Sequence, residues 1–85
     1  MTASKLVVQK SASKRFNKIP LNIHKKILKV LDIIKNNPLV GIKLHGELAY
    51  YRKYRVGDYR VVYRFDRKNK VVRVVKIEHR KGVYR

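Results

Sequence analysis

Five residues in the C-terminal half of the chain carry side chains that could act together on an RNA phosphate. Four are cations and one is a phenol: Lys53, Arg55, Arg60, Arg80 and Tyr84. A lysine or histidine crowded by cations has a lowered pKa and can accept a proton from a ribose 2′-hydroxyl. Neighbouring arginines stabilise the transition-state charge, and a tyrosine can stack on a base. Cleavage by this route needs no metal and leaves a 2′,3′-cyclic phosphate and a free 5′-hydroxyl.

The histidines add one further candidate. His79 precedes Arg80 and lies beside the basic tail, whereas His24 falls in a predicted helix and His45 in a predicted linker. The simpler interpretation is that cations on an exposed strand contact only solvent, and that a tyrosine near the chain end only packs. The residues alone favour contact with nucleic acid over catalysis and leave both open.

Paired carboxylates or a metal are not indicated by the acidic residues. These lie scattered over a predicted helix, a linker, two turns and a strand end, as Asp32, Glu47, Asp58, Asp66 and Glu78. A two-metal nuclease needs several carboxylates to converge. We expect Glu47 and Glu78 to be solvated or paired with cations. Because cysteine is also absent, we predict no metal site and no cofactor.

The charge of the chain points to an anionic partner. Lys and Arg number 23 against 5 Asp and Glu, a formal net charge of +18. A nucleic acid or an acidic protein is the usual neighbour of such a surface. The cations follow strands and helix alike, which disfavours a membrane-binding helix, and no apolar run approaches the ~20 residues that span a bilayer. We predict a soluble cytoplasmic protein that does not bind membranes.

A hairpin is predicted to position the cations. From Tyr50 to Asp66, apolar and aromatic residues alternate with cations on both sides of Gly57-Asp58, a dipeptide suited to a two-residue turn. Lys53 and Arg55 then share one face of the first strand. On the second strand, Arg60, Val62 and Arg64 oppose Tyr59, Val61, Tyr63 and Phe65.

The rest of the chain predicts one domain, residues 1–85, of α+β class. Leu6 to Val8 forms a strand, and Ser11 to Ser13 caps a helix that Pro20 interrupts. A second helix starts near Leu21 and ends at Asn36-Asn37-Pro38. Four further segments are expected to complete the fold: a linker from Leu39 to Leu48 with Ile42 and Leu44 at the core edge, the two hairpin strands, and an interior strand from Lys70 to Ile77.

The ordered motifs resemble the RelE/ParE toxin superfamily, most closely its RelE branch. They are Asn37-Pro38, Gly41-x-Lys43-Leu44-x-Gly46, Arg-Val-Gly-Asp-Tyr-Arg-Val-Val-Tyr from 55 to 63, and Ile77-x-His79-Arg80-x-x-Val83-Tyr84. The resemblance covers nearly the whole chain. It implies an N-terminal strand and a helical hairpin packed on a twisted, mainly antiparallel four-stranded sheet.

The resemblance also implies an activity and partners. RelE-like toxins enter the A site of the 70S ribosome and cleave mRNA by metal-independent 2′-hydroxyl attack, and an acidic antitoxin silences them. Carried over by motif, the catalytic residues are Lys53, Arg55, Arg60, Arg80 and Tyr84, with His79 in a supporting role. Two departures stand out. Arg52 occupies a position that is usually apolar, so it reaches the sheet rim or the register shifts, and the chain ends one residue after Tyr84.

Two other functions remain open from the sequence. A ParE-like inhibitor of DNA gyrase shares the fold and acts by binding a protein, but that branch generally lacks the His-Arg and tyrosine set. A non-catalytic module that binds RNA or the ribosome needs only the charge.

Overall fold

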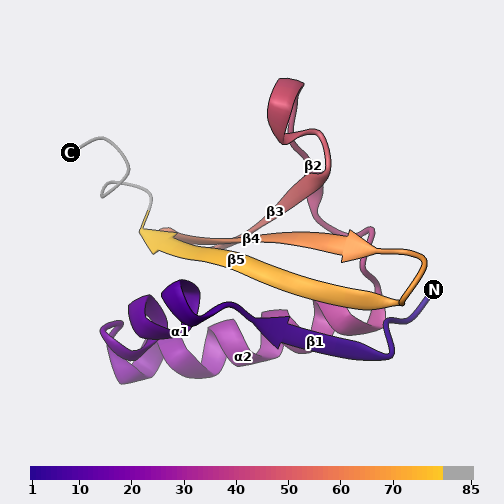
Figure 1. Ribbon diagram of the computed structural model, residues 1–85. Coiled ribbons are helices and arrows are strands. Elements are labelled where there is room, and N and C mark those ends of the chain that lie inside the picture. The colour runs from indigo at the N-terminus through magenta and orange to yellow at the C-terminus, as the bar shows by residue number, and fades with distance from the viewer. Residues whose placement is uncertain (80–85) are drawn as a thin grey trace.

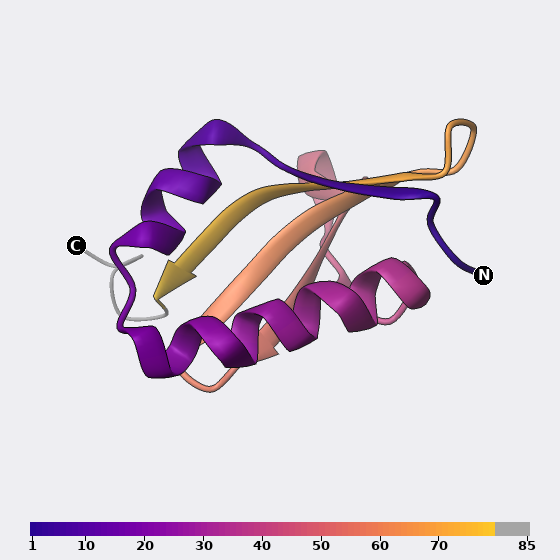
Figure 2. The same ribbon diagram turned by 90° about the horizontal axis from the view of Figure 1, so that it is seen from below.

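The computed structural model describes residues 1–79 as two helices and a mixed sheet (Figure 1). The elements in chain order are β1 (Lys5–Val8), α1 (Lys10–Asn17), α2 (Leu21–Asn36), β2 (Ile42–Lys43), the 3-10 turn η1 (Gly46–Leu48), β3 (Tyr51–Val56), β4 (Tyr59–Asp66) and β5 (Val71–His79). The strand order is β1-β5-β4-β3-β2, with β1 parallel to β5 and the other pairs antiparallel. Both helices cover one face of this sheet (Figure 2). We call the other side the open face.

The predicted fold class is confirmed, with one more strand than expected within residues 1–79. The additional strand is β2, which pairs Ile42 with Lys53 and Lys43 with Arg52 inside the predicted linker. Because paired residues share a face, Ile42 projects with Lys53 on the open face and is 67% exposed, contrary to the prediction that it reaches the core. Leu44 is half-buried.

The hairpin of β3 and β4 forms as predicted. Val56 pairs with Tyr59 across the two residues Gly57 and Asp58, and Gly57 adopts φ 59°. A positive φ at only the first central position is the pattern of a type II′ turn, which matches the twist of the flanking strands. The register is unbroken along β3, so Lys53 and Arg55 share the open face.

The helices begin and end close to the predicted residues, with a different N-terminal cap on α1. Gln9 is the N-cap and its side chain makes no capping hydrogen bond, whereas Ser11 and Ser13 lie inside the helix. Pro20 separates the helices and is the N-cap of α2. The core beneath the sheet contains Ile27, Val30 and Ile34 of α2 together with buried side chains of β4 and β5. None of the helices described is long and apolar enough to cross a membrane.

A β-bulge in β5 changes which residues face the helices. Tyr63 of β4 pairs with Val74 and its neighbour Val62 pairs with Lys76, so Val75 is an additional residue on β5. Val72 and Val74 are therefore buried before the bulge, and Ile77 is buried after it. The sequence prediction of an interior strand is confirmed. The bulge places Val72, Val74 and Ile77 on the same face, although Ile77 differs from the two valines in sequence parity.

Candidate active site

A hollow of about 570 Å³ lies on the open face, which the helices leave uncovered. Its described lining residues come from five segments: Gln9, Ser11, Leu44, Leu48, Tyr51, Lys53, Arg60, Val62, Val75, Lys76 and Glu78. We call this site the open-face hollow. It brings together two of the predicted residues, Lys53 and Arg60, and adds a third cation, Lys76. Cations and apolar side chains thus line one concave surface.

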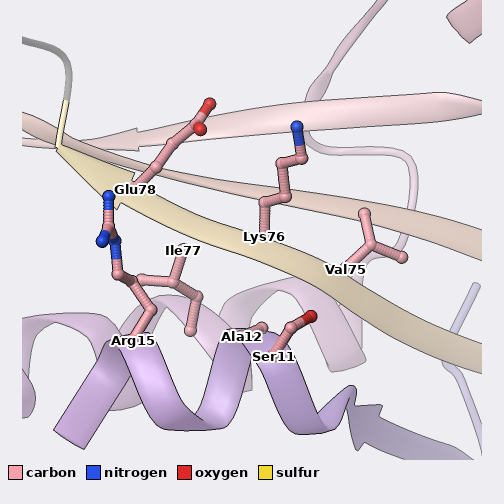
Figure 3. Close-up of a pocket in the computed structure, with 7 residues that line it drawn as sticks. All are labelled: Ser11, Ala12, Arg15, Val75, Lys76, Ile77 and Glu78. Atoms are coloured by element: carbon pink, nitrogen blue, oxygen red, sulfur yellow. The ribbon is translucent and has the colours of Figure 1, made fainter. Parts of the chain in front are cut away.

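The bulge at Val75 supplies one wall of this hollow. In a regular strand Lys76 and Glu78 would continue the buried parity of Val72 and Val74. The additional residue turns both side chains to the open face, and Figure 3 shows them rising from β5 on the side away from α1, while Ile77 points toward the helix. Bulges are common beside active sites because they redirect side chains in this way.

Arg60 is held by an ion pair across two strands. Its Nε donates to Oε1 of Glu78 at 2.7 Å, and the two residues are directly paired in the β4 and β5 register. The side chains are 31% and 19% exposed, so the contact is partly shielded from water. Within residues 1–79 this is the one ion pair, in a chain of net charge +18. Of the two roles expected for Glu78, pairing with a cation is the one observed.

Arg55 and Arg52 occupy the margins of the site. Arg55 is paired with Arg60 in the register and shares its face, but its Nε donates to the Gly57 carbonyl oxygen at 3.1 Å and the residue does not line the hollow. Arg52 faces the helix side and its Nη1 reaches the Gly41 carbonyl oxygen at 2.9 Å. Arg52 therefore extends to the sheet rim without shifting the strand register.

The apolar wall of the hollow is anchored by Tyr63. Its hydroxyl donates to the Pro38 carbonyl oxygen at 2.8 Å and accepts from the Gly41 backbone N–H at 2.9 Å, fixing the start of the segment that carries Leu44 and Leu48. The Tyr63 side chain is fully buried, and this burial raises the pKa of its phenol. A Cβ on Gly41 would lie 2.7 Å from that hydroxyl oxygen and 2.9 Å from the Lys53 carbonyl oxygen, so only glycine fits.

His79 lies apart from Lys53 and Arg60. It pairs with Tyr59, on the helix side of the sheet, and their rings meet edge to face at a centroid distance of 4.8 Å. A second, smaller hollow of about 210 Å³ is lined there by Arg15, Lys18, Ile19, Tyr59 and His79. We call it the helix-face hollow. The alternation of strand side chains puts Glu78 and His79 on opposite faces, so the structure does not bring His79 to the open-face hollow.

Two predicted residues, Arg80 and Tyr84, lie outside the described residues. Sequence reasoning missed Lys76, the bulge at Val75 and the apolar wall of Leu44, Leu48 and Tyr51. The sequence of β5 contained a signal for the bulge, because its apolar residues change parity between Val74 and Ile77.

The sequence of this chain matches a known protein family over most of its length. Residues 6–84 match the family described as the ParE toxin of the type II toxin-antitoxin system parDE. The chain belongs to the RelE/ParE toxin superfamily. A search of curated proteins gave no match. As a member of this superfamily, the chain is a toxin of a toxin-antitoxin system.

Solved structures of RelE toxins are similar to this toxin. The RelBE2 toxin-antitoxin complex from Mycobacterium tuberculosis matches with TM-score 0.84 and 27% identity, covering 93% of this chain and 100% of that one. The archaeal RelE-RelB complex from Pyrococcus horikoshii matches with TM-score 0.75 and 26% identity, covering 94% and 97%. The isolated RelE toxin of E. coli matches with TM-score 0.78 and 25% identity, covering 93% and 88%.

Proposed function

We propose that this toxin is a ribosome-dependent endoribonuclease that cleaves mRNA in the ribosomal A site without a metal. The observation that carries the proposal is the convergence of Lys53 and Arg60 on the open-face hollow, together with Lys76. Three cations around one concavity suit a phosphate that gains negative charge in the transition state. The similarity to RelE toxins at 25% identity or more supports the same activity class.

The proposed chemistry uses in-line attack within the RNA. The 2′-oxygen forms a bond to the adjacent phosphorus, and its hydroxyl proton passes to a general base, a role that we assign to Lys53. Arg60 donates hydrogen bonds to the equatorial phosphate oxygens as their charge grows. The bond from phosphorus to the 5′-oxygen then breaks, and the departing oxygen takes up a proton from water. The products are a 2′,3′-cyclic phosphate and a 5′-hydroxyl. We assign Arg55, Arg80 and Tyr84 to holding the substrate beside this centre.

The proposed partners follow from charge and from the solved relatives. Two of the similar structures are complexes of RelE with RelB antitoxins. A net charge of +18 favours an acidic antitoxin for this toxin as well. We propose that this antitoxin covers the open face of the sheet and so prevents RNA from binding there. Co-expression with the cognate antitoxin is expected to restore growth; continued arrest without a co-purifying acidic protein would count against this partner.

Inhibition of DNA gyrase is the second candidate, because the matching family is described by the name ParE. A supercoiling assay on the purified toxin separates the two functions, since gyrase inhibition needs no ribosome and leaves mRNA intact. A third possibility, a non-catalytic RNA-binding module, predicts salt-sensitive binding to programmed ribosomes with uncut mRNA.

Primer extension on mRNA from expressing cells tests the proposal. The wild type is expected to produce new 5′ ends within translated codons, and Arg60→Ala is expected to reduce them strongly. Arg67→Ala is the matched control, because it removes the same charge from the exposed turn between β4 and β5. Equal cleavage by wild type and Arg60→Ala would refute the site, and absence of cleavage by the wild type would refute the activity.

A further inference from the structure

We propose that Glu78 is a positioning residue that aligns Arg60 for catalysis, an inference that rests on the proposed ribonuclease activity. Glu78 is the only acidic side chain among the described residues that line the open-face hollow. A carboxylate in a site for RNA repels the substrate phosphate, and so weakens ground-state binding. Its position therefore calls for a role that offsets this repulsion.

The contact geometry supplies that role. Arg60 donates its Nε–H to Oε1 of Glu78, with 2.7 Å between the two heavy atoms. A guanidinium has five N–H donors in a rigid planar fork, so fixing the Nε–H fixes the plane and leaves the two terminal nitrogens as the donors for a phosphate. Without Glu78, the long arginine side chain samples several rotamers and must lose this entropy in the transition state.

The backbone also fixes this pair. Arg60 and Glu78 are cross-strand neighbours, and the bulge at Val75 is what turns Glu78 onto the face of Arg60. Arg15 of α1 lines a neighbouring hollow of about 320 Å³ with Glu78 (Figure 3), but the ion pair is made with Arg60. The carboxylate is thus directed to the proposed catalytic arginine.

Two effects of opposite sign follow from removing the carboxylate. Alignment of Arg60 is lost, which lowers kcat, while the repulsion of the phosphate is also lost, which leaves KM unchanged or lower. A residue that only maintained the fold would not produce this split. If Glu78 instead inhibited the toxin by repelling the phosphate, its removal would raise kcat.

Multiple-turnover cleavage on programmed ribosomes, which gives kcat and KM, tests the inference with Glu78→Ala and Glu78→Gln. We expect kcat to fall about 10- to 100-fold in Glu78→Ala, and less in Glu78→Gln, whose amide oxygen still accepts from Nε. KM is expected not to rise in either variant. In an Arg60→Ala background, Glu78→Ala is expected to change kcat less than about twofold, because both substitutions remove one unit.

Several outcomes would overturn the inference. These are wild-type kcat in Glu78→Ala, an increased kcat, or an undiminished effect of Glu78→Ala in the Arg60→Ala background. Loss of cleavage in Arg60→Ala with full cleavage in Glu78→Ala would remove only the role of Glu78, whereas a wild type that cleaves nothing would refute the activity itself. NMR of the Arg60 Nε–H group gives a second measurement. A sharp signal in the wild type that broadens in Glu78→Ala, with an unchanged melting temperature, supports the inference. The same signal in both proteins contradicts it.

Discussion

The open-face and helix-face hollows lie on opposite sides of the β4 and β5 strands and differ in how their cations are held. In the open-face hollow, Arg60 is oriented by a carboxylate and is flanked by Lys53 and Lys76. In the helix-face hollow, Arg15 and Lys18 are exposed, and the described lining contains no carboxylate. In a chain of this charge, a cation alone identifies no site. The carboxylate that orients the arginine distinguishes the two hollows.

The largest expected effect is a difference between two arginines. Arg60→Ala removes the oriented guanidinium of the open-face hollow and is expected to lower kcat about 100- to 1,000-fold, the usual loss for one donor to a transition-state oxyanion. Arg15→Ala removes an arginine that lines the helix-face hollow and is expected to lower kcat less than about threefold. Multiple-turnover cleavage on programmed ribosomes measures kcat for both variants. Comparable losses would mean that the side of the sheet on which an arginine lies does not decide its contribution to cleavage.

The next effect concerns the segment that carries Leu44 and Leu48, two apolar lining residues of the open-face hollow. Tyr63→Phe leaves the Gly41 N–H and the Pro38 carbonyl oxygen without their hydroxyl partner. We expect the free energy of unfolding to fall by about 1 to 3 kcal/mol, the cost of leaving buried polar groups unpaired. Urea unfolding followed by circular dichroism measures the change. Unaltered stability would show that the hydroxyl does not anchor this segment.

The same tyrosine gives a smaller, pH-dependent effect. Burial raises the pKa of Tyr63 in the folded state above its ordinary value. The folded protein therefore holds this proton to higher pH than the unfolded chain, and the stabilisation is complete below the ordinary tyrosine pKa and is lost as pH rises through the folded-state pKa. The stability difference between wild type and Tyr63→Phe is expected to shrink above about pH 10. A constant difference across that range would contradict this assignment.

The smallest effect is expected at His79. Because its ring packs on Tyr59 at the helix-face hollow, His79→Ala is expected to lower kcat no more than about threefold, with a small loss of stability from the lost ring contact. The same cleavage assay and a melting curve measure the two quantities. A fall in kcat as large as that of Arg60→Ala would give His79 a catalytic role and would contradict the proposed difference between the two hollows.

Local patterns in the sequence predicted most of this arrangement. The hairpin, its turn at Gly57 and the shared face of Lys53 and Arg55 follow from alternation and turn chemistry, and all are observed. The position of Glu78 could not be derived in this way, because one additional residue, Val75, reverses the parity of everything after it. Ile42 was misplaced for a related reason, since a two-residue edge strand carries too few residues to show a period.

Long-range contacts were also beyond the sequence. The hydroxyl of Tyr63 meets Pro38 and Gly41, more than 20 residues earlier in the chain, and no local pattern reports such a pairing. The parity of Tyr63 predicted only that it would be buried.

An NMR titration with a short RNA that carries 2′-O-methyl groups, and so cannot be cleaved, tests the central claim most directly. The amide and side-chain signals of Lys53, Arg60 and Lys76 are expected to shift together, while those of Arg15, Lys18 and Tyr59 stay in place. Shifts confined to the second group would put the RNA on the helix side of the sheet and contradict the account.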